Sequence, residues 1–309
     1  MVLSLLADGG ADLVPAAAGA SGPARRRLAA DGGAHRDGGR ARRHLCAERR
    51  PPGRLVSVTA REAAGDPDVL VEAVDLQKRF RTFHAVRGVS FRCYAGEVFG
   101  LLGPNGAGKT TTLRMLTTIL RPTSGGARIA GYDVTREPEA VRRVIGVLPE
   151  QAGIYGRLTA REAVRYAGRL YGVQPEVLEG RVEAILETLE MAPHIDRITD
   201  TLSRGMKQKV NIARALVHDP PVVFLDEPTS GLDVISARSV REFVRRFKRD
   251  GRCVILSTHI MEEAERLCDR VAIIAGGRVL AQGRLAELKA HTGLGLEETF
   301  VQFVEDTVR

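Results

Sequence analysis

Short apolar runs alternate with longer segments of helical periodicity along most of the chain after residue 68. The runs contain few polar residues, which is typical of strands in a parallel sheet covered on both faces. They lie at residues 98–102, 145–148, 222–225, 253–256 and 271–274. Helical periodicity lies at residues 111–120, 235–247 and 260–267. This alternation predicts an α/β fold with a mostly parallel core sheet.

Two further groups of elements accompany this core. Residues 69–74, 86–91 and 128–132 have the composition of strands, and Gly276-Gly277 predicts a hairpin before residues 278–281. Between about residues 159 and 216, apolar side chains instead recur at helical spacing, as in Val182, Ile185, Leu186 and Leu189. We interpret about residues 152–216 as a helical subdomain inserted into the sheet.

Residues 1–67 form an Ala/Gly/Arg-rich extension without aromatic residues. Such a segment buries too little apolar area to offset the entropy of ordering, so we expect it to be disordered and dispensable. The favoured interpretation is a functionless extension or a start codon placed too far upstream. A basic arm for anionic lipid or nucleic acid and a targeting peptide are the alternatives, and Asp8, Asp12, Asp31 and Asp37 disfavour the peptide. Residues 68–309 then form the folded domain.

Composition limits the classes of function. The chain has 309 residues and 44% hydrophobic residues, with no apolar run near the roughly 18 residues that span a bilayer. A role at a membrane would therefore need a separate membrane chain. About half of the net charge of +8 lies in residues 1–67, so the folded part does not point to nucleic acid. The scattered cysteines (Cys46, Cys93, Cys253 and Cys268) fit reduced thiols better than a disulfide frame or a zinc site.

The strongest chemical pattern lies between residues 103 and 111, after an apolar strand and before a helix. It has the form G-x-x-x-x-G-K-T and consists of Gly103, Pro104, Asn105, Gly106, Ala107, Gly108, Lys109, Thr110 and Thr111. In this context the glycines let backbone N–H groups and the helix N-terminus surround a phosphate. Lys109 can reach the β- and γ-phosphates, and the hydroxyl of Thr110 can bind Mg²⁺. The pattern predicts nucleotide binding.

A second set of residues supplies acid–base chemistry. Asp226 ends an apolar strand and can hold Mg²⁺, while Glu227 is expected on the other side of the strand, where it can polarise a water. The alternative is an acidic pair that caps the next helix or pairs with a surface arginine. Ser203 and Gly205 open a helix whose N-terminus can meet an anion. His259 follows a strand and can donate a hydrogen bond to a γ-phosphate.

These motifs, in this order, resemble the ATP-binding subunit of an ABC transporter over about residues 69–304. Residues 103–111 are similar to its Walker A loop, 202–206 to its signature, 224–227 to its Walker B strand with the catalytic glutamate, 230–233 to its D-loop, and 259 to its switch histidine. The resemblance implies a P-loop NTPase fold with an antiparallel β subdomain. It also implies that Phe80 stacks on adenine and that Asp233 belongs to the nucleotide site.

The resemblance further implies ATP and Mg²⁺ as cofactors, catalytic roles for Glu227, His259 and Lys109, and a homodimer without nucleic acid. It implies a location at the cytoplasmic membrane face, against a permease on another chain. The signature reads Ser-Arg-Gly-Met where the family usually has Ser-Gly-Gly-Gln. The glutamine that approaches Mg²⁺ aligns with Glu150, followed by Gln151, and both stay candidates.

The chain resembles the sodium-extrusion (Nat-type) exporters and the related antibiotic-export ATPases at residues 150–162, 203–209, 215–220, 251–254 and 292–301. Sodium efflux is the first expectation, and drug, antibiotic or lipid export is the second. A soluble ABC ATPase acting on DNA is disfavoured because no long coiled coil separates the Walker A loop from the signature. A ribosome-acting ATPase is disfavoured because only one cassette is present. The intact Lys109, Asp226, Glu227 and His259 argue against a binding module without catalysis.

Overall fold

A six-stranded sheet forms the centre of the fold, in the order β10-β9-β3-β8-β7-β6. Its parallel strands are β3 (Val98–Leu102), β6 (Ile145–Leu148), β7 (Val222–Asp226), β8 (Cys253–Thr258) and β9 (Arg270–Ala275). The hairpin strand β10 (Arg278–Arg284) is antiparallel to β9. Every residue of β3 and β7 is buried, as expected for strands covered on both faces. The predicted parallel core is confirmed.

The computed structural model of the chain describes residues 68–292 and 295–308, which lie in the unit Leu55–Arg309. The predicted disorder of residues 1–67 lies outside the described residues. Among the helices of the described part, none is long and apolar enough to cross a membrane.

A second sheet is antiparallel and has the order β2-β1-β4-β5. Its strands are β1 (Val69–Phe80), β2 (Phe83–Tyr94), β4 (Ser124–Ile129) and β5 (Tyr132–Asp133). The first two are longer than residues 69–74 and 86–91, because polar residues alternate with buried ones along this half-exposed hairpin. The prediction of a single strand at residues 128–132 was wrong, because β4 ends at Ile129 and β5 begins at Tyr132. Ala130 and Gly131 have positive φ angles of 47° and 83°, which turn the chain between β4 and β5.

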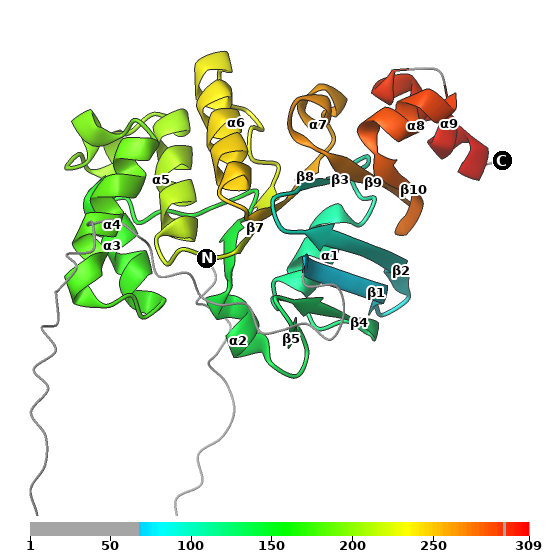
Figure 1. The fold of residues 1–309 in the computed structure, drawn as a ribbon, viewed down its shortest axis with the longest axis horizontal. Coiled ribbons are helices and arrows are strands. Elements are labelled where there is room, and N and C mark those ends of the chain that lie inside the picture. Colours follow the sequence, from blue (N-terminus) through cyan, green and yellow to red (C-terminus); the bar gives the residue numbers. More distant parts are fainter. Residues whose placement is uncertain (1–67, 293–294, 309) are drawn as a thin grey trace, which may run out of the picture. The chain divides into compact units, whose positions relative to one another are not determined.

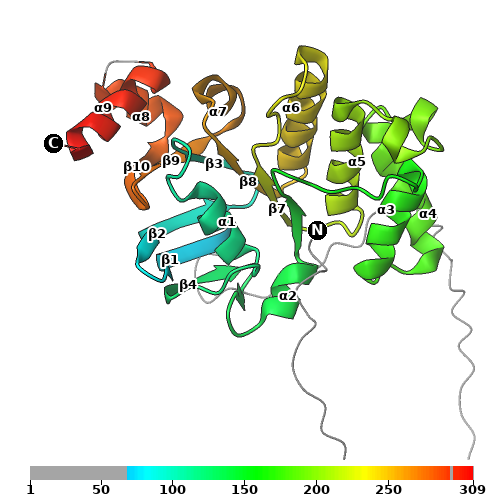
Figure 2. The same ribbon diagram turned by 180° about the vertical axis from the view of Figure 1, so that it is seen from behind.

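Helices cover the central sheet on both faces, as Figures 1 and 2 show. Helix α1 (Lys109–Leu116) lies between the two sheets and contacts β1, β2, β4 and β7, and α2 (Pro138–Arg143) precedes β6. Helices α6 (Val234–Arg249) and α7 (Met261–Leu267) pack on the opposite face. The prediction that the first helix continues to residue 120 was wrong, since Thr118 adopts a left-handed φ of 61°.

The helices α3 (Ala160–Leu170), α4 (Pro175–Thr188) and α5 (Arg204–Leu216) form a group at the β6 end of the sheet (Figure 1). Short 3₁₀ turns at η1 (Ala192–His194) and η2 (Thr199–Thr201) connect α4 to α5. Thr159 and Glu162 form a reciprocal capping box that fixes the start of α3. Helix α5 also packs on α6, so it joins the helical group to the core.

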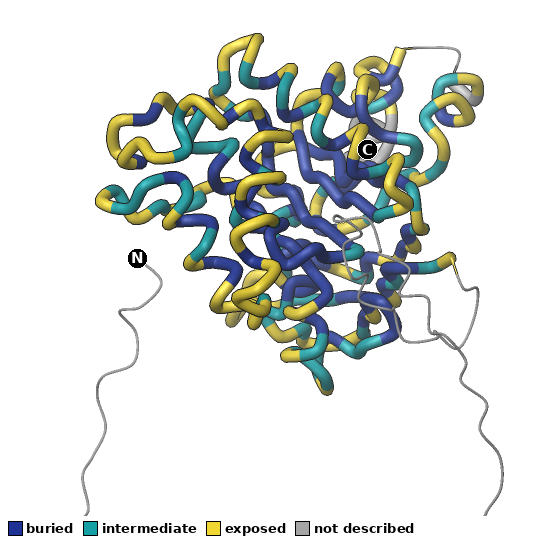
Figure 3. The backbone as a smooth tube through the Cα atoms, turned by 60° about the vertical axis from the view of Figure 1, so that its left-hand side comes forward, coloured by how far each residue is buried: buried dark blue, intermediate teal, exposed yellow. Residues whose placement is uncertain are grey.

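Buried residues concentrate along the central strands and the helices packed on them (Figure 3). One apolar cluster lies between the sheet and α3–α7, and the other lies between the sheet, α1 and the antiparallel strands. Two further helices, α8 (Leu285–Thr292) and α9 (Leu296–Val308), follow β10. The parallel strands β3, β7 and β8 therefore end at one edge of a well-packed sheet, where their loops carry the predicted motifs.

Candidate nucleotide site

A glycine-rich loop, residues 103–108, connects β3 to α1. Gly106 and Gly108 have φ angles of 80° and 106°, which other residues rarely adopt. A Cβ atom on Gly103 would lie 2.2 Å from the carbonyl oxygen of Ile274, so only glycine fits there. Helix α1 has no acidic residue in its first turn, which leaves its positive N-terminal end open to an anion.

Lys109 is the first residue of α1, and its side chain is buried beside the loop. Its Nζ donates hydrogen bonds to the carbonyl oxygens of Gly103, at 2.7 Å, and Pro104, at 3.2 Å. It also lies 3.7 Å from a carboxylate oxygen of Glu227. Burial lowers the pKa of Lys109, and the nearby charges of Glu227 and Asp226 oppose that shift. The carbonyl oxygens of the loop thus hold the ammonium group of Lys109 in place, and a bound phosphate could replace them as its hydrogen-bond acceptor.

Asp226 ends β7 next to Ser257 of β8, in the register of the parallel pair. Its Oδ1 accepts hydrogen bonds from the hydroxyl of Ser257 and, at 3.3 Å, from the hydroxyl of Thr110. The structure thus brings together Thr110 and Asp226, two of the residues predicted to bind Mg²⁺. Ser257 was missed, and its only signal in the sequence is a polar residue at the end of an apolar run.

Glu227 follows Asp226 and adopts a left-handed φ of 50°. Its N–H donates to the carbonyl oxygen of Ser257 at 3.1 Å, and its carboxylate oxygens lie 2.9 and 3.0 Å from Nδ1 of His259. The expectation that Glu227 faces away from Asp226 was wrong. The strand ends at Asp226, and the left-handed residue that follows turns its carboxylate back toward Lys109.

The signature residues lie on a different part of the chain. Ser203 caps α5 by accepting a hydrogen bond from the N–H of Met206 at 3.2 Å. Gly205 packs against α6, where an added Cβ would lie 2.0 Å from the hydroxyl of Ser236. Within residues 68–292, neither Ser203 nor Gly205 hydrogen-bonds to the phosphate loop. Their predicted contact with nucleotide stays a prediction.

Asp233 caps α6 through both carboxylate oxygens. It accepts hydrogen bonds from the N–H groups of Ile235 and Ser236 and from the hydroxyl of Ser236, and these bonds lower its pKa. Arg204, at the start of α5, donates to the carbonyl oxygen of Ser230 at 3.1 Å. The signature and residues 230–233 are therefore neighbours. The structure gives Asp233 a helix-capping role, and its nucleotide contact stays a prediction.

Glu150 and Gln151 line a cavity of about 200 Å³ together with Asp226 and Arg114. The charge of Glu150 also acts on Lys109, where it works against the lowering of the lysine pKa. Both candidates for the glutamine position therefore lie beside the predicted metal site. Glu150 has the more direct electrostatic link to the phosphate loop.

The remaining predicted residues are Phe80, on the antiparallel sheet, and Asn105, Ala107 and Thr111, in the loop and the first turn of α1. Phe80 ends β1 with 42% of its surface exposed, and Nζ of Lys78 lies 5.2 Å from its ring centroid. Asn105 is exposed, Ala107 is buried, and Thr111 lies in the first turn of α1. An exposed aromatic ring at the end of a hairpin can stack on a base.

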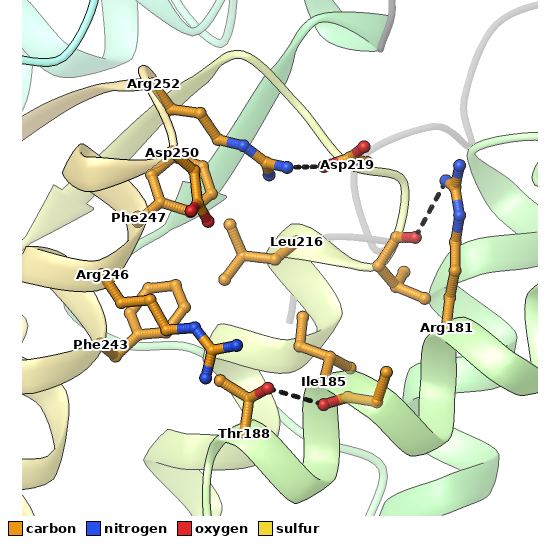
Figure 4. Close-up of a pocket in the computed structure, with 12 residues that line it drawn as sticks. Arg181, Ile185, Thr188, Leu216, Asp219, Phe243, Arg246, Phe247, Asp250 and Arg252 are labelled. Atoms are coloured by element: carbon orange, nitrogen blue, oxygen red, sulfur yellow. Dashed lines mark hydrogen bonds and ion pairs between the residues drawn. The ribbon is translucent and has the colours of Figure 1, made fainter. Parts of the chain in front are cut away.

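A separate cavity of about 210 Å³ lies between α4 and α6 (Figure 4). Its walls include Ile185 and Phe243, and its arginines are partly engaged: Arg252 pairs with Asp219, and Arg181 donates to a backbone carbonyl. None of the predicted site residues lines this cavity. This cavity is therefore separate from the predicted nucleotide site at the ends of β3, β7 and β8.

Comparison with known proteins identifies the family to which the chain belongs. A family model described as "ABC transporter" matches residues 86–230. The ABC transporter ATP-binding protein NatA of Bacillus subtilis is 42% identical over 224 residues, which cover 71% of this chain and 91% of that protein. The chain belongs to the ABC transporter ATP-binding family. It is accordingly an ATP-binding protein and an ABC-type ATPase, as the motifs predicted.

Other comparisons agree with this family. The daunorubicin/doxorubicin resistance ATP-binding protein DrrA of Streptomyces peucetius is 41% identical over 227 residues, which cover 74% of this chain and 69% of that protein. A solved ATP-binding subunit of an ABC transporter matches 76% of this chain and 99% of its own length, with a TM-score of 0.71 and 34% identity. A second family model, described as "AAA domain, putative AbiEii toxin, Type IV TA system", matches residues 196–265. The fold class expected for this family is therefore confirmed.

Proposed function

We propose that this ABC ATPase is the ATP-hydrolysing subunit of a membrane exporter and drives a permease on a separate chain at the cytoplasmic membrane face. The observation that carries the proposal is that Glu227 contacts both Lys109 and His259 at the edge of the sheet where the phosphate loop lies. Lys109 begins α1, Glu227 follows β7 and His259 follows β8, yet the three side chains meet next to the phosphate loop. A charge-stabilising lysine, a carboxylate and an imidazole at one place suit hydrolysis of a phosphoanhydride.

Each residue has a role in this proposal. The loop N–H groups and Lys109 bind the phosphates, and Phe80 stacks on the adenine. Glu227 orients and polarises the attacking water, while His259 fixes the carboxylate of Glu227 through Nδ1. The hydroxyl of Thr110 and the carboxylate of Asp226 are oxygen donors of the kind that Mg²⁺ prefers, and they already touch. When bound, Mg²⁺ would neutralise phosphate charge, and Glu150 or Gln151 stands near enough to contribute.

The exported species is proposed to be sodium ion, from the resemblance of residues 150–162 to Nat-type exporters. Drug or antibiotic export is the second candidate, since DrrA, a daunorubicin/doxorubicin resistance protein, is nearly as similar as NatA. Lipid export falls under the same alternative. Inverted vesicles that contain this chain and the permease encoded beside it should take up radioactive sodium when ATP is added. ATP-dependent uptake of an anthracycline without sodium movement would instead support the second candidate.

We propose that the working unit is a head-to-tail homodimer. Ser203 caps the N-terminus of α5 and Gly205 lies in its first turn, and neither residue hydrogen-bonds to the phosphate loop of its own chain. A second copy, turned around, could place this N-terminus over the bound γ-phosphate. Each copy would then complete the site of the other.

The Glu227→Gln variant should form this dimer only when ATP is present, because it binds ATP without consuming it. Light scattering with saturating ATP should show twice the monomer mass, and the same variant with ADP should stay monomeric. A monomer under both conditions, in a protein shown to bind ATP, would argue against the dimer. A dimer without any nucleotide would argue against ATP as its cause.

The segment after Glu150 is proposed to face the permease. Tyr155 is 55% exposed, and its ring packs edge-on against Tyr166, which is also exposed, with centroids 5.9 Å apart. Ile154, expected to be exposed with it, is instead partly buried against the core. Two neighbouring exposed tyrosines on the segment that follows Glu150 form a suitable anchor for a partner.

Tyr155→Ala should leave the basal ATPase activity of the isolated subunit intact and abolish its stimulation by the permease. A buried aromatic anchor commonly contributes about 2 kcal/mol or more to an interface, which is enough to dissociate a moderate complex. The measurement is ATPase activity with and without permease vesicles, and Val301→Ala, which removes an exposed apolar side chain on α9, is the control. Normal stimulation of Tyr155→Ala would remove Tyr155 from the interface, and lost basal activity would indicate a packing role.

A further inference from the structure

A buried carboxylate on α7 lies next to the site but has no place in the mechanism above. Glu263 is only 5% exposed. Its Oε1 accepts a hydrogen bond of 2.6 Å from the hydroxyl of Thr229, and its Oε2 accepts one of 2.9 Å from the hydroxyl of Thr258. Both threonines are themselves buried, so the two bonds are shielded from water.

The two threonines belong to the two segments that carry the reacting side chains. Thr258 directly precedes His259, and its hydroxyl oxygen also accepts a bond from the N–H of Ile260 at 3.1 Å. Thr229 lies two residues after Glu227, and its carbonyl oxygen accepts a bond from the N–H of Leu232 at 3.1 Å. One carboxylate therefore spans the loop that follows Glu227 and the loop that carries His259.

Packing alone does not account for a carboxylate at this position. Burial raises the pKa of Glu263, the hydroxyl bonds partly offset the shift, and the charge of Glu227 adds to it. An apolar side chain of similar size would fill the space without this desolvation cost. What the carboxylate provides, and an apolar side chain cannot, is two acceptors that hold two hydroxyl groups at a fixed separation.

We propose that Glu263 is a positioning residue that joins Thr229 to Thr258 and thereby holds the Glu227–His259 pair in its reactive arrangement. The inference rests on the proposed roles of Glu227 and His259 in hydrolysis. Residues 230–233 continue directly from Thr229 and adjoin the signature segment through the Arg204–Ser230 bond. A second copy that contacts residues 230–233 can therefore shift Thr229, and Glu263 transmits that shift to Thr258 and His259.

The test compares Glu263→Gln, which is isosteric, with Glu262→Gln on the exposed face of the same helix. ATP affinity, measured by calorimetry, should change by less than about twofold in both variants. The turnover number of Glu263→Gln should fall about 10- to 100-fold, since small misplacements of reacting groups cost about that much. Glu262→Gln should keep full turnover. A folded Glu263→Gln with normal turnover would overturn the proposal.

A double-mutant cycle separates positioning from general destabilisation. Thr229→Val and Thr258→Val each remove one hydroxyl donor, and each should lower turnover with unchanged ATP affinity. Combining either with Glu263→Gln should add little further loss, because the three side chains act as one unit. Losses that multiply, or that follow the melting temperature of each variant, would instead indicate independent structural roles.

A readout that needs no turnover keeps this inference separate from the proposed function. The imidazole NMR signals of His259 should shift in Glu263→Gln and stay unchanged in Glu262→Gln. If Glu263→Gln shows this shift but the wild-type protein does not hydrolyse ATP, the proposed function fails and the positioning role stands. If Glu227→Gln is inactive while Glu263→Gln is fully active with unshifted His259 signals, only the positioning role fails.

Discussion

Replacing Glu227 with glutamine should leave ATP binding nearly unchanged and reduce turnover by about 10²–10⁴-fold, the range that a positioned general base contributes. Both carboxylate oxygens lie within 3.0 Å of Nδ1 of His259, and one lies 3.7 Å from Lys109, so the group is already held beside the phosphate loop. The amide keeps the size of the side chain but cannot polarise a water. Phosphate release at saturating ATP and calorimetric affinity measure the two quantities separately.

Glu262→Gln provides the matched control, because it removes an exposed carboxylate from the helix that follows His259. Its turnover should equal that of the wild type. Turnover of Glu227→Gln within about threefold of the wild type would remove Glu227 from the catalytic role. Loss of ATP affinity would show instead that its contact with Lys109 organises the phosphate loop.

Local patterns were enough to predict the central sheet. Strands buried on both faces appear as uninterrupted apolar runs, and β6 has the predicted bounds, Ile145–Leu148. The hairpin β1–β2 was predicted too short because only one of its faces is buried, so polar residues such as Gln77 and Lys78 interrupt the apolar pattern. The turn at Ala130 was missed because alanine carries no signal for a positive φ.

The site was predictable wherever one motif defines it, as in the phosphate loop. It was not predictable where residues distant in sequence meet. Ser257 reaches Asp226 across 31 positions, and Glu263 reaches Thr229 across 34, and no local pattern marks either pair. The orientation of Glu227 likewise depends on its left-handed φ and on the bond from its N–H to β8. Strand pairing, rather than residue spacing, completes this site.

Lys109→Ala should have the broader effect, lowering both ATP affinity and turnover. The ammonium group is buried, donates to two loop carbonyls and stands 3.7 Å from Glu227, so it lies where phosphate oxygens would bind. A hydrogen bond to a charged group contributes about 1.5–3 kcal/mol, which corresponds to a loss of affinity of about 10- to 100-fold. Turnover at saturating ATP should fall as well, because the same charge stabilises the transition state.

Calorimetry and steady-state hydrolysis should be run on Lys109→Ala beside Arg249→Ala, which removes a positive charge from the exposed end of α6. Arg249→Ala should keep the ATP affinity and turnover of the wild type. Losses seen only in Lys109→Ala would then come from the nucleotide site and not from the change in net charge. Unchanged affinity with lost turnover would mean that the loop N–H groups and the N-terminus of α1 bind the phosphates without help. In that case Lys109 would stabilise the transition state alone. Its two hydrogen bonds to the loop carbonyl oxygens would then only hold the side chain in position before hydrolysis.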